Sequence, residues 1–130
     1  MLRRFLKWNA ERRAWNRDHE VAWAGARVPT ESGLSRFQIL CEPVILAEFK
    51  AARIAVVDRE VVGERERYIK ARLDGTPWTL WIYLDGAEIG SAGGTLVRME
   101  DWDAKTPHEF IATFVRKVRA AIGTQSEKSV

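Results

Sequence analysis

Residues with an obvious capacity for catalysis are few in this 130-residue chain. It contains two histidines, His19 and His108, and one cysteine, Cys41. A nucleophilic site needs a hydroxyl or thiol held beside a base, and no motif of that kind surrounds these residues. Cys41 stands in the apolar run QILCEP, where a cysteine usually serves as a small buried hydrophobe. The run GSAGG (90–94) lies between expected strands rather than before a helix, so it lacks the context of a phosphate-binding loop.

Carboxylates offer the strongest remaining case for chemistry. Glu100, Asp101 and Asp103 form a cluster, and we expect Asp85 and Glu88 near them in space. Paired carboxylates can hold Mg²⁺ or act as general acid and base. Anionic residues are also favoured where a strand leads into a helix N-terminus, which explains this cluster without a ligand. The sequence therefore predicts no catalytic residue, no metal ligand and no cofactor, and hence a protein that is not an enzyme.

The stretch WTLWIYLD at residues 78–85 carries the clearest sign of recognition. Successive side chains of a strand point to opposite faces, and both faces of this strand are apolar or aromatic. One face holds Trp78, Leu80, Ile82 and Leu84. The other face, joined by a tyrosine and cations from other strands, supplies our candidate partner-binding residues: Trp81, Tyr83, Tyr68, Lys70, Arg72 and Arg98.

Two classes of partner suit such a face. Aromatic side chains beside cations bind single-stranded nucleic acid by base stacking and phosphate neutralisation. Trp, Tyr and Arg also supply most of the hot spots in protein–protein interfaces. A third interpretation is that the protein covers the face itself, because residues 1–64 precede the aromatic strands and must pack on something. We expect the N-terminal helices to cover it.

The N-terminal segment is the second candidate surface. The net charge is +3, yet residues 1–27 hold seven basic residues against three acidic ones, so the basic character is an N-terminal property. An amphipathic helix of this composition can lie on anionic lipid or on nucleic acid. More commonly the charges form a solvated face while Phe5 and Trp8 dock on the core, and we expect that here. The cations of this surface are Arg3, Arg4, Lys7, Arg12, Arg13 and Arg17.

Local patterns predict the helices and the first strand. Residues 2–24 have helix-forming composition, with apolar side chains recurring every three or four positions. Residues 35–52 form a second helix, with Pro43 either at a kink or in the first turn. Residues 53–62 are rich in β-branched side chains, which favours a strand over a helix that continues to Asp58.

The remaining elements form a meander. Residues 65–73 and 78–85 are expected to pair around the loop DGTP, with Ile69 opposite Ile82 and Lys70 opposite Trp81. The second strand continues through Ala87–Ile89, and a further strand begins at Thr95. A capping box, Thr106–Glu109, starts a C-terminal helix that ends at Gly123.

These elements predict one α+β domain, residues 1–123, followed by a flexible tail, residues 124–130. Its N-terminal helices precede an antiparallel meander of three or four strands. The C-terminal helix packs on the inner face of the sheet, which carries Ile69, Leu80, Ile82 and Val97.

Composition sets the class and the expected compartment. Hydrophobic residues make up 46% and charged residues 30%, an ordinary globular balance. A single cysteine excludes an intramolecular disulfide and suits a reducing compartment. The start, MLRRFLKWNAERRAW, is too interrupted by charge for a signal peptide, and no apolar run is long enough for a membrane span. We expect a cytoplasmic protein.

Residues 51–89 resemble small uncharacterised bacterial proteins whose C-terminal halves are strand meanders, through an apolar, Arg-Glu and Gly pattern between strands. The resemblance implies a bacterial setting, in which immunity proteins, antitoxins and adaptors are common. Together with the lack of a catalytic constellation and the six tryptophans, it leads us to expect a non-enzymatic protein-binding module of this bacterial type. Nucleic-acid binding, through the sheet or the basic N-terminal helix, is the alternative. A homo-oligomer stays open.

Overall fold

The computed structural model describes residues 2–128 of the chain, with side chains through residue 122. The α+β class is confirmed. The elements follow in the order α1 (Leu2–Ala24), α2 (Arg36–Ala51), β1 (Val56–Val62), β2 (Tyr68–Leu73), β3 (Thr79–Ile82), β4 (Gly86–Ser91), β5 (Gly94–Glu100) and α3 (Pro107–Lys128). A single 3₁₀ turn, Asp101–Asp103, lies between β5 and α3.

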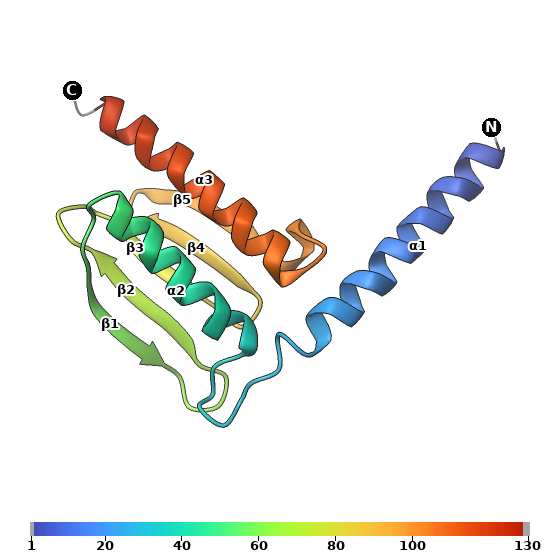
Figure 1. The fold of residues 1–130 in the computed structure, drawn as a ribbon, viewed down its shortest axis with the longest axis horizontal. Coiled ribbons are helices and arrows are strands. Elements are labelled where there is room, and N and C mark those ends of the chain that lie inside the picture. Colours follow the sequence, from blue (N-terminus) through green and yellow to red (C-terminus); the bar gives the residue numbers. More distant parts are fainter. Residues whose placement is uncertain (1, 129–130) are drawn as a thin grey trace.

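The five strands form one antiparallel sheet in sequence order, and α2 and α3 lie across the same face of it (Figure 1). The predicted pairing of β2 with β3 is confirmed, because Ile69 lies opposite Ile82 and Lys70 opposite Trp81. The loop between them closes where the Leu73 N–H donates to the Trp78 carbonyl at 3.1 Å. Alternation and turn chemistry therefore set both the register and the two faces of this hairpin.

The prediction of three or four strands was wrong. Residues 56–62 do form a strand, as the β-branched cluster indicated, and α2 ends before it at Ala51. The additional strand arises because the chain turns at Leu84–Asp85 instead of continuing through Ala87–Ile89. The Tyr83 N–H donates to the Gly86 carbonyl at 2.8 Å, and β4 returns antiparallel to β3. The two loop residues are Leu84 and Asp85, while Gly86 already belongs to β4, so the Asp85–Gly86 pair marks the neighbourhood of the turn without occupying its two central positions.

The inner face of the sheet forms the core with α2 and α3. Its predicted residues are buried, with exposed fractions of 0–1% for Ile69, Leu80 and Ile82 and 6% for Val97. Phe110 and Phe114 of α3 are fully buried against this core. The packing of the C-terminal helix on the inner face is therefore confirmed. Burial of large apolar side chains of this kind supplies most of the stability of a small domain.

The N-terminal end of α2 is tied into the sheet. Ser35 and Gln38 form a capping box, in which each side chain accepts a hydrogen bond from the backbone N–H of the other. The Gln38 amide also donates to the carbonyls of Arg67 and Ile82. Pro43 lies inside the helix rather than in its first turn.

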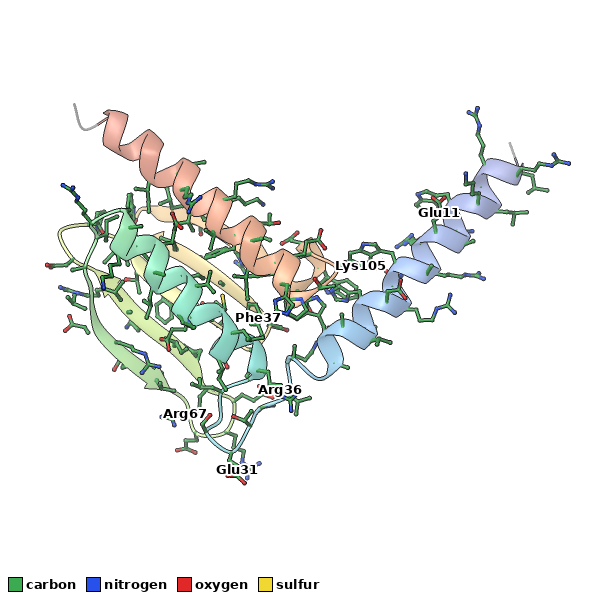
Figure 2. The ribbon with its side chains drawn as sticks, in the orientation of Figure 1. Glu11, Glu31, Arg36, Phe37, Arg67 and Lys105 are labelled. Carbon is green, nitrogen blue, oxygen red and sulfur yellow. The ribbon has the colours of Figure 1, made fainter. Side chains whose placement is uncertain are left out.

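Helix α1 spans the predicted residues but projects from the body (Figure 1). Its C-terminal part holds the only two buried side chains of the helix, His19 and Trp23. The more N-terminal residues extend into solvent, as the position of Glu11 in Figure 2 illustrates. The expectation that Phe5 and Trp8 dock on the core was wrong, since they are 57% and 53% exposed. A helix of 23 residues is about 35 Å long and reaches past the edge of the body at which it is anchored.

Helix α3 begins at Pro107, as predicted. The Glu109 N–H donates to the Thr106 hydroxyl at 3.2 Å, while the Glu109 carboxylate accepts from the Lys105 N–H at 3.0 Å. The helix does not end at Gly123 but continues to Lys128, because one glycine in a helix costs only about 1 kcal/mol and does not force an end. The expected flexible tail thus falls partly on this helix, and residues 129–130 lie outside the described residues.

Among residues 2–128, no helix combines the length and apolar character needed to cross a membrane.

Candidate functional site

The sheet face opposite α2 and α3, here called the outer face, carries the aromatic residues that the sequence singled out. No helix in the described part of the chain lies over it (Figure 1). The expectation that the N-terminal helices cover it was wrong: α2 packs on the inner face and α1 projects away. Helices α2 and α3 lie over the inner face, and α1 extends away from the sheet, so neither face gains a further helix.

Three aromatic rings meet on the outer face. The Tyr68 ring lies 5.7 Å from the Trp81 ring and 5.8 Å from the Tyr83 ring, measured between centroids. The Lys70 ammonium lies 4.9 Å from the Trp81 centroid, within cation–π range. These contacts follow from the register of β2 with β3, which sets Lys70 directly opposite Trp81. Cross-strand neighbours of this kind are pre-positioned by the sheet itself.

All three predicted cations of the outer face have an acidic partner. Lys70 lies 4.0 Å from Glu60, Arg72 lies 3.1 Å from Asp58, and Arg98 lies 2.9 Å from Glu100, measured between charged atoms. The partners of Lys70 and Arg72 come from β1, where a bulge between Val57 and Glu60 gives Asp58 a φ of 54°. The charges of the outer face are therefore balanced locally rather than presented as free cations.

Tyr83 also interacts with an acid on its own face. Its hydroxyl donates to Glu88 Oε2 at 3.5 Å, while the Thr95 hydroxyl donates to Glu88 Oε1 at 3.0 Å. Burial raises the pKa of Tyr83, and the negative charge of Glu88 adds to that effect. Tyr83 is consequently a neutral phenol at physiological pH, able to donate one hydrogen bond.

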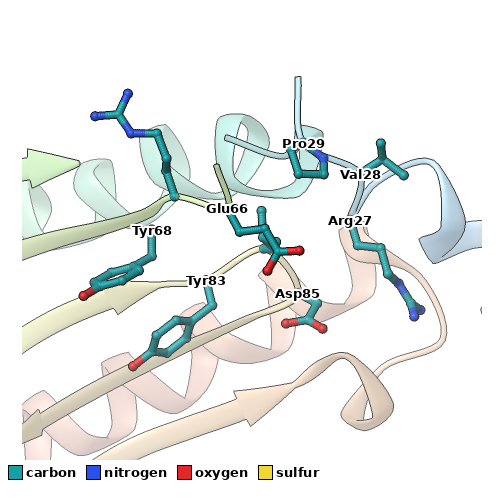
Figure 3. Close-up of a pocket in the computed structure, with 9 residues that line it drawn as sticks. Arg27, Val28, Pro29, Glu66, Tyr68, Tyr83 and Asp85 are labelled. Atoms are coloured by element: carbon teal, nitrogen blue, oxygen red, sulfur yellow. The ribbon is translucent and has the colours of Figure 1, made fainter. Parts of the chain in front are cut away.

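A hollow of about 540 Å³ adjoins the aromatic cluster at one end of the sheet (Figure 3). Tyr68 lines it from the start of β2 and Tyr83 from the turn that follows β3, and the carboxylates of Glu66 and Asp85 point into the same space. A second hollow, of about 440 Å³, lies on the other side of Tyr83 and Asp85 and reaches Trp102. No pattern in the sequence indicates either hollow, because the walls of each join separate segments of the chain.

Residues of the predicted acidic cluster take part in local hydrogen bonds and an ion pair. Asp103 accepts a hydrogen bond from the Glu100 N–H at 2.8 Å and so caps the 3₁₀ turn. Asp101 is 5% exposed and lies 3.1 Å from the Arg27 guanidinium. Burial raises the pKa of Asp101, and the charge of Arg27 opposes that rise. Within the described residues, no group of three or more His, Cys, Asp or Glu side chains is arranged to hold a metal ion.

His19 and Cys41 have structural positions too. His19 Nε2 lies 2.7 Å from the carbonyl oxygen of Asp101, and since a carbonyl only accepts, Nε2 is the donor. The imidazole stacks on Trp102 at 4.6 Å, which anchors α1 to the body, and on Trp15 of the same helix at 5.0 Å. Cys41 is fully buried, as expected, and burial raises the pKa of its thiol to about 12. A thiol in that state is not a nucleophile.

The predicted basic surface of α1 differs from the outer face in its charge pairing. All six of its cations are exposed, and none of them has a carboxylate within ion-pair distance in the described part of the chain. The Arg12 guanidinium lies 5.4 Å from the Trp8 ring centroid, the cation–π contact that the spacing allowed. The structure thus separates two predicted surfaces, a balanced aromatic face and a projecting basic helix.

No family model, curated protein or solved structure matches this chain.

Proposed function

We propose that this protein is a non-enzymatic binding module whose outer face engages another protein. The proposal retains the bacterial immunity, antitoxin-like or adaptor class that the sequence led us to expect, acting in the cytoplasm. The observation that carries it is the cluster of Tyr68, Trp81 and Tyr83 on a sheet face without a covering helix.

The geometry of this cluster supports a protein partner. Tyrosine and tryptophan offer a large contact area with few rotatable bonds, so little side-chain entropy is lost when a partner covers them. Here the register of β2 with β3 and the ring-to-ring contacts already restrain the side chains. An aromatic centre surrounded by paired, exposed charges has the anatomy of a protein interface, in which the centre lacks charge and the rim is polar.

Charge pairing makes the outer face less suited to nucleic acid, the alternative function. Single-strand binding requires cations that are free to neutralise phosphates. Lys70, Arg72 and Arg98 each lie beside a carboxylate, and Glu88 adds a further negative charge to the same face. A phosphate would have to compete with these carboxylates for every cation. A partner protein can use both signs of charge.

Affinity capture with matched variants tests the proposal. The tagged full-length protein is incubated with extract of its native host, with nuclease present, and bound proteins are identified by mass spectrometry. We expect a stoichiometric partner that Trp81→Ala loses and Trp8→Ala retains. Trp8 is a suitable control because it is an exposed tryptophan on α1, away from the outer face. Truncating an interface tryptophan costs roughly 2 kcal/mol or more, a loss of about 30-fold in affinity.

The rim offers a second readout. The substitution Arg98→Glu should weaken binding of the same partner while leaving the unfolding curve nearly unchanged, since the Arg98–Glu100 pair is exposed.

Three results would overturn the proposal. The first is a partner retained equally by Trp81→Ala and Trp8→Ala, and the second is a catalytic turnover that depends on Asp101 or Asp103. The third is quenching of tryptophan emission by an oligonucleotide, if Trp81→Phe abolishes that quenching.

A further inference from the structure

The first two turns of α1 form an amphipathic tip, residues 2–8, at the end of the helix that projects from the body (Figure 1). At about 100° per residue, its three cations fall within an arc of about 100°. The four large apolar side chains fall within an opposite arc of about 160°. These are Arg3, Arg4 and Lys7 on one side and Leu2, Phe5, Leu6 and Trp8 on the other.

The apolar side of the tip has no cover within the described residues. Leu2 is 72% exposed, Phe5 and Leu6 are each 57% exposed, and Trp8 is 53% exposed. The Phe5 and Trp8 rings contact each other at 6.4 Å, so they form one small patch rather than scattered residues. Contiguous exposed apolar surface rimmed by polar residues marks an interaction site.

The charge around the tip restricts its occupant. Between residues 2 and 17 the helix carries Arg3, Arg4, Lys7, Arg12, Arg13 and Arg17 against Glu11 alone. A second copy packed on the apolar side would cover Leu2, Phe5 and Leu6 but leave the cations of the opposite side without an anionic partner. Nucleic acid would neutralise the cations but leave Leu2, Phe5 and Leu6 in water. An anionic bilayer satisfies both sides at once, with phosphates for the cations and the acyl boundary for the apolar residues.

We propose that the tip of α1 binds the surface of anionic lipid bilayers. Insertion is confined to residues 2–8, because Arg12 and Arg13 fall within the same arc as the apolar side chains and end the amphipathic pattern. Their long side chains reach the headgroup level, where they add to the attraction. The body stays clear of the bilayer because the tip lies at the far end of α1 from His19 and Trp23, the residues that anchor the helix. This inference is independent of the proposed protein partner, which uses the outer face.

Vesicle partitioning of the full-length protein tests the inference. The probes are phosphatidylcholine vesicles with and without about 30% phosphatidylserine, assayed by flotation at low and physiological salt. We expect binding only to the anionic vesicles, weakening as salt screens the charges. A cation near an anionic surface contributes about fivefold in affinity, so Arg3→Glu with Lys7→Glu should lower partitioning at least about 25-fold.

Two further double variants make the test specific. Phe5→Ser with Leu6→Ser changes no charge and should lower partitioning at least about tenfold, because two large apolar side chains leave the acyl boundary. Arg116→Glu with Lys117→Glu makes the same charge change on the exposed surface of α3 and should keep partitioning within about twofold. All substituted residues are exposed, so far-ultraviolet circular dichroism should confirm an unchanged fold.

The inference is overturned if the α1 and α3 charge variants behave alike, or if Phe5→Ser with Leu6→Ser leaves partitioning unchanged. It is also overturned if the protein does not bind anionic vesicles but binds a DNA or RNA oligonucleotide through the same cations. A dimer that is detected by light scattering and dissociated by the Phe5 and Leu6 substitutions would overturn it as well. The oligonucleotide and dimer outcomes would assign the tip to nucleic acid or to a second copy of the chain.

Discussion

Gln38 offers the most exacting test of how the fold positions the outer face. Its side chain is fully buried and makes three hydrogen bonds. Oε1 accepts from the Ser35 N–H at 2.7 Å, and Nε2 donates to the carbonyls of Arg67 at 2.8 Å and Ile82 at 2.9 Å. Arg67 and Ile82 immediately precede Tyr68 and Tyr83 in the chain. One amide on the inner side therefore holds the backbone from which both tyrosines project on the outer side.

The substitution Gln38→Leu keeps the volume of the side chain and removes all three hydrogen bonds. A typical hydrogen bond contributes about 1 kcal/mol net, and each buried group left without a partner adds a further cost. The expected loss in the free energy of unfolding is roughly 3–5 kcal/mol. Small domains are stable by only about 5–15 kcal/mol, so the variant loses a large part of its stability.

Urea unfolding, followed by tryptophan fluorescence and by circular dichroism, measures this loss as a shift of the midpoint at a constant slope. The exposed neighbour Arg36 provides the control, because Arg36→Ala should change the stability by about 0.5 kcal/mol or less. A loss below about 1 kcal/mol for Gln38→Leu would refute the reasoning, since it would mean that the three bonds are replaced by water or do not persist. Partner binding by the folded fraction of Gln38→Leu should also weaken if the amide positions the tyrosines.

Two other predictions concern ionisable groups. Glu48 on α2 forms two hydrogen bonds with Arg119 on α3, one of them 2.8 Å long from Arg119 Nη2 to Glu48 Oε2, and the side-chain hydrogen bond lowers the pKa of Glu48. Because the pKa of Glu48 is lower in the folded state, its ionised carboxylate stabilises the protein at pH values above the ordinary glutamate pKa. The difference in free energy of unfolding between the unsubstituted protein and Glu48→Gln should therefore shrink as the pH falls through the lowered pKa. Urea unfolding curves at a series of pH values measure this difference, and a difference that stays constant would contradict the prediction. Cys41, whose pKa is raised to about 12 by burial, should resist a thiol reagent at pH 8 in the native protein and react fully in urea, and rapid native labelling would show that its site opens.

The sequence by itself determined the local features of this protein. The DGTP loop and the alternation on either side of it settled the register of β2 with β3, and with it the residues that share a face with Trp81. The periodicity of apolar side chains predicted helix α1, and the Thr106–Pro107 cap predicted the start of α3. These features depend on neighbours a few residues apart, whose steric and hydrogen-bonding demands are the same in any tertiary context.

Tertiary structure alone decided which surfaces are free. A strand that is apolar on both faces does not state which face the helices will bury, because that choice depends on how the whole set of elements packs. Here α2 and α3 share the inner face, so no helix covers Tyr68, Trp81 and Tyr83 on the outer face. Along most of its length, α1 has no part of the body to pack against. Even the ion pair of Arg72 with Asp58, which distinguishes the outer face from a basic one, required the pairing of β1 with β2 and the bulge that contains Asp58. Contacts of this kind join residues far apart in the chain, beyond the reach of local patterns.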